Sequence, residues 1–158
     1  MKLTDILTDS RIDLDLTGDS KNEIIERLVD LVVRDLGGAG KDPILEAVLA
    51  REDLMSTGVG NGVAIPHGKT ESVDSLIAAF GRCPAPVEFE ALDGQPVSLV
   101  FLLVGPEDAA GPHIKALSRI SRLLSYEEFR TRLTNAGTSA EILETITEEE
   151  EQYFELKG

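Results

Sequence analysis

The 158-residue sequence has one cysteine and few basic residues, and each shortage excludes a class of protein. A single thiol, Cys83, cannot form an internal disulfide or a thiolate zinc site, so nothing in the composition requires an oxidising compartment. The 15 Lys and Arg residues against 29 Asp and Glu residues give a net charge of −14, which repels phosphate backbones. We therefore expect no binding to nucleic acid and none to an anionic membrane surface.

Long apolar runs are also absent. No stretch approaches the ~20 residues needed to cross a bilayer, and the first residues lack the continuous apolar segment of a signal peptide. The hydrophobic content of 42% is enough for a packed core, and neither a repeat nor a low-complexity linker divides the chain. We expect a single cytoplasmic domain over residues 1–158, with no insertion into a membrane.

Capping signals predict two helices in the first third of the chain. Ser20 and the glutamate three residues later have the form of a capping box, and Gly37-Gly38 ends the helix that they open. Asp42, followed by a proline, is predicted to cap a second helix that runs to about Met55. Apolar residues at helical spacing indicate that both helices bury one face.

The middle of the chain predicts strands. Three short apolar runs, at 63–65, 76–80 and 97–104, are bounded by glycine and proline. The third run is apolar on both faces, as expected of a central strand covered by helices on each side. Because helices precede and follow these strands, the predicted fold class is α/β, a single-domain sandwich with a mixed central β-sheet flanked by helices.

Three further helices are predicted after the last strand. They begin at Gly111-Pro112, at Ser125 and at Thr138, and the first runs to about Leu124. Consecutive glutamates lie in the acidic segment 147–158. We expect this segment to be the solvated face of the last helix, with a frayed end.

His67 follows a loop with glycine at alternate positions. Such a loop leaves backbone N–H groups uncovered, as phosphate-binding nests do, at residues Thr57, Gly58, Gly60, Asn61 and Gly62. The spacing fits neither a Walker loop nor the dinucleotide fingerprint. Pro66 cannot continue the strand before it, so His67 is placed just beyond a strand end, where reactive side chains are commonly presented. The structural alternative is an ordinary surface histidine in a turn.

His113 and Arg51 have unusual positions on their predicted helices. His113 lies in a first turn, four residues before Leu117, and so heads the apolar stripe, where the positive helix end favours neutral imidazole. Arg51 follows Val48 along another apolar stripe, and its guanidinium fork suits phosphate oxygens. The structural alternatives are a core-edge histidine bonded to a carbonyl and an arginine that reaches solvent.

These segments together resemble a known family. From Arg51 to Lys69, with the core Ile65-Pro66-His67-Gly68-Lys69, the chain is similar to the active-site signature of the mannitol/fructose-type (type 2) enzyme IIA proteins of the bacterial phosphoenolpyruvate:sugar phosphotransferase system. The similarity continues through Val87-Glu88-Phe89 and Asp93-Gly94-Gln95-Pro96-Val97 to the later histidine on a helix. It extends over nearly the whole chain.

The resemblance implies that His67 is the phosphorylated histidine, His113 the second active-site histidine and Arg51 the active-site arginine. It implies a phosphohistidine carrier that accepts its phosphoryl group from an HPr-like histidine phosphocarrier protein, a component of phosphoryl transfer rather than a stand-alone turnover enzyme. Positioning and electrostatics do nearly all the work in such a transfer, so we expect neither a cofactor nor a metal. Asn61, together with Gly68-Lys69, is most similar to the nitrogen-regulatory branch.

The downstream role is open at this point. No transmembrane or enzyme IIB segment is fused to the chain, so we expect a free-standing regulatory protein whose partner is a kinase or a transporter. The alternative is a fructose- or mannitol-specific enzyme IIA that passes its phosphate to an enzyme IIB during sugar uptake. Two remote alternatives are a zinc site built from His67, His113 and carboxylates, and a pure interaction module.

Overall fold

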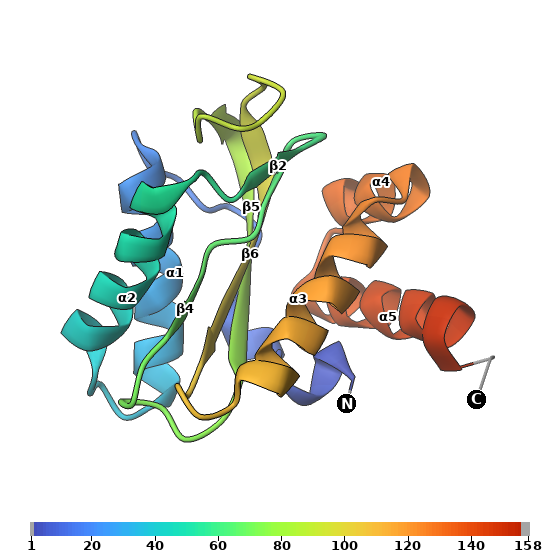
Figure 1. Cartoon of the computed structure of the whole chain (residues 1–158). Coiled ribbons are helices and arrows are strands. Elements are labelled where there is room, and N and C mark those ends of the chain that lie inside the picture. Colours follow the sequence, from blue (N-terminus) through green and yellow to red (C-terminus); the bar gives the residue numbers. More distant parts are fainter. Residues whose placement is uncertain (1, 156–158) are drawn as a thin grey trace.

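Helices cover both faces of a central sheet in the computed structural model, which describes residues 2–155 (Figure 1). One face carries α1 (Lys21–Asp35) and α2 (Lys41–Leu54). The other face carries α3 (Ala110–Leu124), α4 (Glu127–Asn135) and α5 (Ser139–Glu150). Short 3₁₀ turns, Leu3–Asp5 and Asp9–Arg11, begin the chain, and a π-helical turn, Glu151–Glu155, follows α5. Within the described residues, no helix is both long and apolar enough to span a bilayer.

The sheet is mixed, and its central strand is β6. Six strands pair in the order β1-β5-β6-β3-β2, and β4 also pairs with β6. The strands are β1 (Ile12–Asp13), β2 (Gly58–Gly60), β3 (Val63–Ala64), β4 (His67–Lys69), β5 (Ile77–Val87) and β6 (Val97–Gly105). β6 runs antiparallel to β5 and parallel to β3 and β4. The arrangement confirms the predicted fold class.

The long apolar run of β6 is explained by two cores. Successive residues of a strand point to opposite faces, so Leu99, Phe101 and Leu103 pack under α3, α4 and α5, whereas Val100, Leu102 and Val104 pack under α1 and α2. All of β6 except Ser98 is buried. The prediction of a central strand covered on both sides is therefore confirmed.

Two of the predicted helix caps are confirmed. The hydroxyl of Ser20 accepts the N–H of Glu23 at 3.2 Å and opens α1. The hydroxyl of Thr138 accepts the N–H of Glu141 at 3.1 Å and opens α5. In both cases a short polar side chain satisfies an N–H group that has no partner within the helix.

Two other predicted helix starts are wrong. Asp42 does not cap α2, because Gly40 in a left-handed conformation (φ +86°) starts the helix earlier and its carbonyl accepts the N–H of Ile44. Ser125 does not open α4, because it ends α3 instead: its hydroxyl donates to the carbonyl of Arg122 at 2.6 Å. In the first case the backbone geometry of the preceding turn overrides the side-chain signal, and in the second the serine hydroxyl bonds back to α3 rather than forward to α4.

The prediction of a solvated acidic tail is also wrong where the structure describes it. Glu149 and Glu150, at the end of α5, are only 5% and 1% exposed. The Glu150 carboxylate accepts the N–H of Leu3 at 2.9 Å and pairs with Arg119 of α3 at 2.9 Å. Phe154 then lies 4.3 Å from the Arg119 guanidinium. Hydrogen bonding and ion pairing thus draw a carboxylate inward; residues 156–158 of the predicted tail lie outside the described residues.

We predict that Glu150→Ala lowers the free energy of unfolding by about 3 kcal/mol, since it leaves Arg119 and the N–H of Leu3 without their carboxylate. Urea unfolding followed by circular dichroism measures the change. The matched control is Glu148→Ala, which removes a half-exposed carboxylate paired with Arg132 and is expected to cost less than about 1 kcal/mol. Equal costs for the two variants would contradict the structural role of Glu150.

Candidate functional site

His67 is the first residue of β4, and its tautomer is fixed by the backbone. Its Nδ1 lies 2.8 Å from the carbonyl oxygen of Ile65. Because that oxygen can only accept, Nδ1 carries the proton and donates it, which leaves the lone pair on Nε2. Pairing of His67 with Leu103 of β6 fixes the backbone beneath the ring. The structure therefore presents Nε2 as the nucleophilic atom.

The environment of His67 favours the neutral ring. Burial lowers the pKa of His67 below its ordinary value, and the positive charges of Arg51 and Lys69 lower this pKa further. The hydrogen bond to Ile65 and the charge of Glu52 act in the opposite direction. A neutral imidazole is the form that can attack phosphorus, so this balance suits nucleophilic chemistry at neutral pH.

Gly68 brings Arg51 to the histidine. A β-carbon at Gly68 would lie 3.0 Å from the backbone nitrogen of Val48 and 3.1 Å from the carbonyl carbon of Ala47, both on α2. A side chain here would push the helix away from β4 by a few tenths of an ångström, so glycine favours this close packing. Arg51 lies one turn further along α2, and its Nη1 donates to the carbonyl oxygen of Met55 at 2.9 Å. The guanidinium is therefore held beside His67 by the end of its own helix.

His113 faces His67 from the first turn of α3. The two ring centroids are 5.8 Å apart, with the planes tilted by 57°. His113 is only 3% exposed, and among the described residues neither of its ring nitrogens has a hydrogen-bond partner. Glycine again makes room, because a β-carbon at Gly105 would lie 3.0 Å from Nδ1 of His113. Burial lowers the pKa of His113 to about 4, and the nearby His67 and Lys69 contribute.

These side chains line one open cavity of about 590 Å³. Arg51, His67 and His113, which the sequence singled out, meet there. Sequence reasoning gave the other lining residues no role in the site. Lys69 supplies a cation and Glu107 a carboxylate. The rest of the wall is formed by Ala47, Gly68, Ile114 and Leu117. Lys69 carried a signal, since it ends the segment that resembles the active-site signature. A cavity with two cations and a neutral N–H donor around a nucleophile suits a phosphoryl group.

The predicted phosphate loop lies elsewhere. Its glycines form the β2–β3 hairpin, and none of its five residues lines the cavity around His67. Several of its N–H groups already have partners: the N–H of Thr57 donates to Glu52, that of Gly58 to Ser56, and that of Asn61 to Asp93. Turn formation accounts for the alternating glycines, because Gly60 and Gly62 have positive φ.

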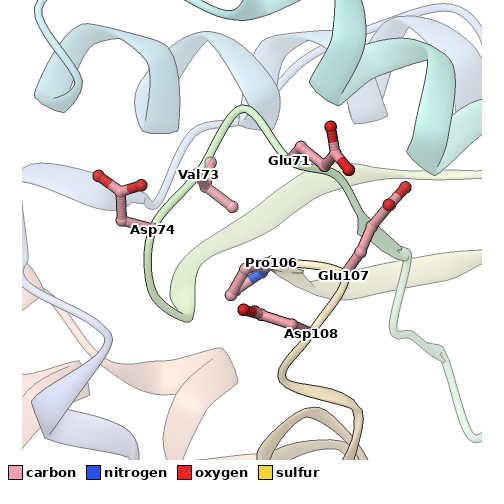
Figure 2. A pocket seen from close by; sticks show the side chains of 6 residues that line it. All are labelled: Glu71, Val73, Asp74, Pro106, Glu107 and Asp108. Atoms are coloured by element: carbon pink, nitrogen blue, oxygen red, sulfur yellow. The ribbon is translucent and has the colours of Figure 1, made fainter.

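A smaller cavity lies next to the first. Four of its six lining side chains are carboxylates: Glu71, Asp74, Glu107 and Asp108 (Figure 2). Glu107 lines both cavities, so negative charge borders the site that holds Arg51 and Lys69. Within residues 2–155, no group of three or more His, Cys, Asp or Glu side chains is arranged to hold a metal ion.

Comparison with known proteins identifies the family. The model of the family described as "Phosphoenolpyruvate-dependent sugar phosphotransferase system, EIIA 2" matches residues 5–149. The chain belongs to the EIIA type 2 family. Within it, a "Nitrogen regulatory protein" of Pseudomonas aeruginosa is 38% identical over 148 residues, which cover 94% of this chain and 96% of that protein.

Other members of the EIIA type 2 family are also similar. The "PTS system fructose-specific EIIABC component" of Bacillus subtilis is 42% identical over 150 residues, but the chain spans only 23% of that protein. The crystal structure of nitrogen regulatory protein IIA-Ntr from Neisseria meningitidis superposes with a TM-score of 0.86 at 38% identity, covering 91% of this chain and 98% of that one. A complex of enzyme IIAMTL with phosphorylated enzyme IIBMTL from Escherichia coli shares the fold (TM-score 0.76, 24% identity, covering 90% and 97%).

We predict that His113 makes stability depend on pH. Its pKa is about 4 in the folded chain against 6.5 ordinarily, so below pH 6.5 the unfolded chain binds a proton that the folded chain does not. The free energy of unfolding should therefore fall by about 3 kcal/mol more in the parent than in His113→Asn between pH 6.5 and 4. Urea unfolding at several pH values measures it, and parallel curves for the two proteins would contradict the assignment.

Proposed function

We propose that His67 accepts a phosphoryl group on Nε2 and holds it in the cavity formed with Arg51, Lys69 and His113. The observation that carries the proposal is His113, a buried neutral ring that faces the nucleophile and has no hydrogen-bond partner among residues 2–155. A buried N–H group without a partner is costly unless a ligand satisfies it. A phosphoryl oxygen on His67 is such a ligand.

On the side of this chain, the phosphoryl transfer requires only residues that line the cavity. The donor is a phosphohistidine, and the lone pair of His67 Nε2 forms the new N–P bond while the old N–P bond breaks. The electron pair of the old bond returns to the donor imidazole. Charge on the transferred group spreads over its equatorial oxygens, where Arg51, Lys69 and the N–H of His113 stabilise it. His67 keeps the proton on Nδ1 throughout, held by Ile65.

The rim of the cavity supports a protein as the donor. Ile114, which is 63% exposed, forms part of the cavity wall, and Leu54 and Met55 are exposed at the end of α2 just after Arg51. Apolar contacts around His67 would exclude water from the transfer. Carboxylates beside the cavity would attract a basic partner. An HPr-like histidine phosphocarrier protein in the cytoplasm is the donor that this surface suits best.

We expect the chain to gain one phosphoryl group when it is incubated with phosphoenolpyruvate, enzyme I and the phosphocarrier protein. Mass spectrometry should show an acid-labile, alkali-stable adduct that is absent from His67→Ala. Arg51→Ala and His113→Ala should be labelled about 10²–10³-fold more slowly, the usual cost of losing one electrostatic donor at a transfer site.

Circular dichroism at the pH of the assay shows whether each variant is folded. Equal labelling of His67→Ala and the parent would overturn the acceptor assignment. Unchanged rates in folded Arg51→Ala and His113→Ala would reduce both residues to structural roles.

The phosphorylated chain acts, in our proposal, as a regulator. Nitrogen regulatory proteins match almost over their full length, both in sequence and in structure. The alternative, sugar uptake through an enzyme IIB, is supported by two fructose-specific relatives and by the fold-level likeness to an enzyme IIA seen in complex with its enzyme IIB. One of these relatives, the "PTS system fructose-specific EIIA component" of Haloferax volcanii, is matched over 98% of its length at 35% identity. Regulation is favoured because the nitrogen regulatory proteins of Pseudomonas aeruginosa and Neisseria meningitidis are 38% identical over nearly all of both chains, and the second superposes with a TM-score of 0.86.

A regulator should bind its target in one phosphorylation state only. We expect phosphorylated and unphosphorylated chains, immobilised side by side, to capture a kinase or a transporter to different extents, because the added charge of about −2 changes which surfaces are attracted. Mass spectrometry of the captured proteins and a direct binding assay with the purified target measure this difference. Rapid transfer from the chain to an enzyme IIB, and from there to a sugar, would favour the alternative.

A further inference from the structure

We propose that Glu52 is a positioning residue for His67, which it reaches through a hydrogen-bonded chain over Thr57 and Ile65. The proposal rests on the role of His67 as phosphoryl acceptor, which it deepens. Sequence reasoning placed Thr57 in a phosphate loop and gave Glu52 no role. The geometry instead places both behind the histidine, on the side away from the incoming group.

The chain of hydrogen bonds begins at a buried carboxylate. Glu52, at the end of α2, is 2% exposed. One oxygen accepts the N–H of Thr57 at 2.9 Å, and the other accepts its hydroxyl at 2.5 Å. Such charge-assisted bonds are shorter and stronger than bonds between neutral groups. Glu52 thus fixes the backbone of Thr57 as the chain enters the β2–β3 hairpin.

The backbones of Thr57 and Ile65 connect this carboxylate to the histidine. The carbonyl oxygen of Thr57 accepts the N–H of Ile65 at 3.0 Å. The carbonyl oxygen of Ile65 accepts Nδ1–H of His67 at 2.8 Å. Each bond fixes the position of the next residue, so the buried carboxylate holds Thr57, Thr57 holds Ile65, and the Ile65 oxygen is held in place for Nδ1. A well-placed acceptor at Nδ1 fixes the ring and keeps the lone pair on Nε2.

The charge of Glu52 also raises the pKa of His67, in opposition to the two cations beside the ring. Burial and the charges of Arg51 and Lys69 favour the neutral form of His67, whereas the hydrogen bond to Ile65 and the charge of Glu52 favour its protonated form. The charged and titratable groups around the ring come from α2, β4, α3 and the segment that follows β6: Arg51, Glu52, Lys69, His113 and Glu107. Of these, Glu52 is the one that raises the pKa of His67, while Arg51 and Lys69 lower it. Glu52 therefore preserves the basicity of a nucleophile that two phosphate-binding cations would otherwise reduce.

The remaining contact of Glu52 supplies a matched control. Lys21, at the start of α1, lies 3.5 Å from Glu52 and 3.2 Å from Glu90. The Glu90 side chain is 78% exposed and is not among the groups that shift the pKa of His67. Glu90→Gln therefore removes one negative charge from the same lysine and leaves the hydrogen-bonded chain intact.

The test uses Glu52→Gln, which keeps the shape of the side chain and removes its charge. Nuclear magnetic resonance titration of the imidazole of His67 in the unphosphorylated full chain is the main readout, because a purely structural role would not move it. We expect His67 to titrate at lower pH in Glu52→Gln than in the parent and in Glu90→Gln. We also expect phosphoryl transfer to slow by about 10-fold, the lower end of what partners of ligating histidines contribute.

A second pair of variants keeps the test decisive where Glu52→Gln fails to fold. Thr57→Ser retains the hydroxyl and should match the parent, whereas Thr57→Ala should shift the titration of His67 in the same direction as Glu52→Gln. An unchanged titration in folded Glu52→Gln or in Thr57→Ala would overturn the proposal. The titration needs no phosphate, so it separates this proposal from the acceptor role: failure of His67 to be labelled would overturn that role even where the titration shifts as expected.

Discussion

Two neutral imidazoles, 5.8 Å apart, are the feature on which the site depends. Protonation of His67 would remove the lone pair on Nε2, and protonation of both rings would make them repel each other. Burial keeps both neutral, and burial in turn requires that helices pack close to strand ends. Gly68 allows α2 to approach β4, and Gly105 allows His113 to lie against β6. Each glycine thus leaves space for a neighbouring helix residue to pack closely, one on each face of the sheet.

The charge of the site is opposite to that of the molecule. A chain with a net charge of −14 would repel a phosphoryl group, yet the cavity contains Arg51 and Lys69, whose fields are strongest where water is partly excluded. These cations stabilise the phosphoryl group but also make the nucleophile less basic. The buried carboxylate of Glu52 offsets this loss of basicity, because its charge raises the pKa of His67. Glu52 does not line the cavity in which a phosphoryl oxygen would bind.

The sequence predicted best where one local signal has one structural outcome. The doubly apolar run of β6, bounded by glycine and proline, is typical of a central strand, and the hydroxyls of Ser20 and Thr138 cap the helices as expected. It also predicted that His67, His113 and Arg51 meet. The sequence did not distinguish two structures that share one pattern. Alternating glycines suit both a phosphate-binding nest and a tight hairpin, and the hairpin is identified by strand pairing and by the hydrogen bonds of Thr57 to Glu52. The burial of Glu150 depends on Leu3, almost the whole chain away, which no local pattern reveals.

A site built on paired strands limits how phosphorylation can be sensed. His67, Gly68 and Lys69 pair in register with residues 103–105 of β6, the central strand of the sheet, of which all residues but Ser98 are buried. A displacement of His67 would break this ladder and the bond to Ile65 together, whereas added charge alters the site without any such movement. In the proposed mechanism the dianion forms beside Glu107 and the acidic cavity next to it. The charge of this surface is therefore the property by which a partner distinguishes the two states.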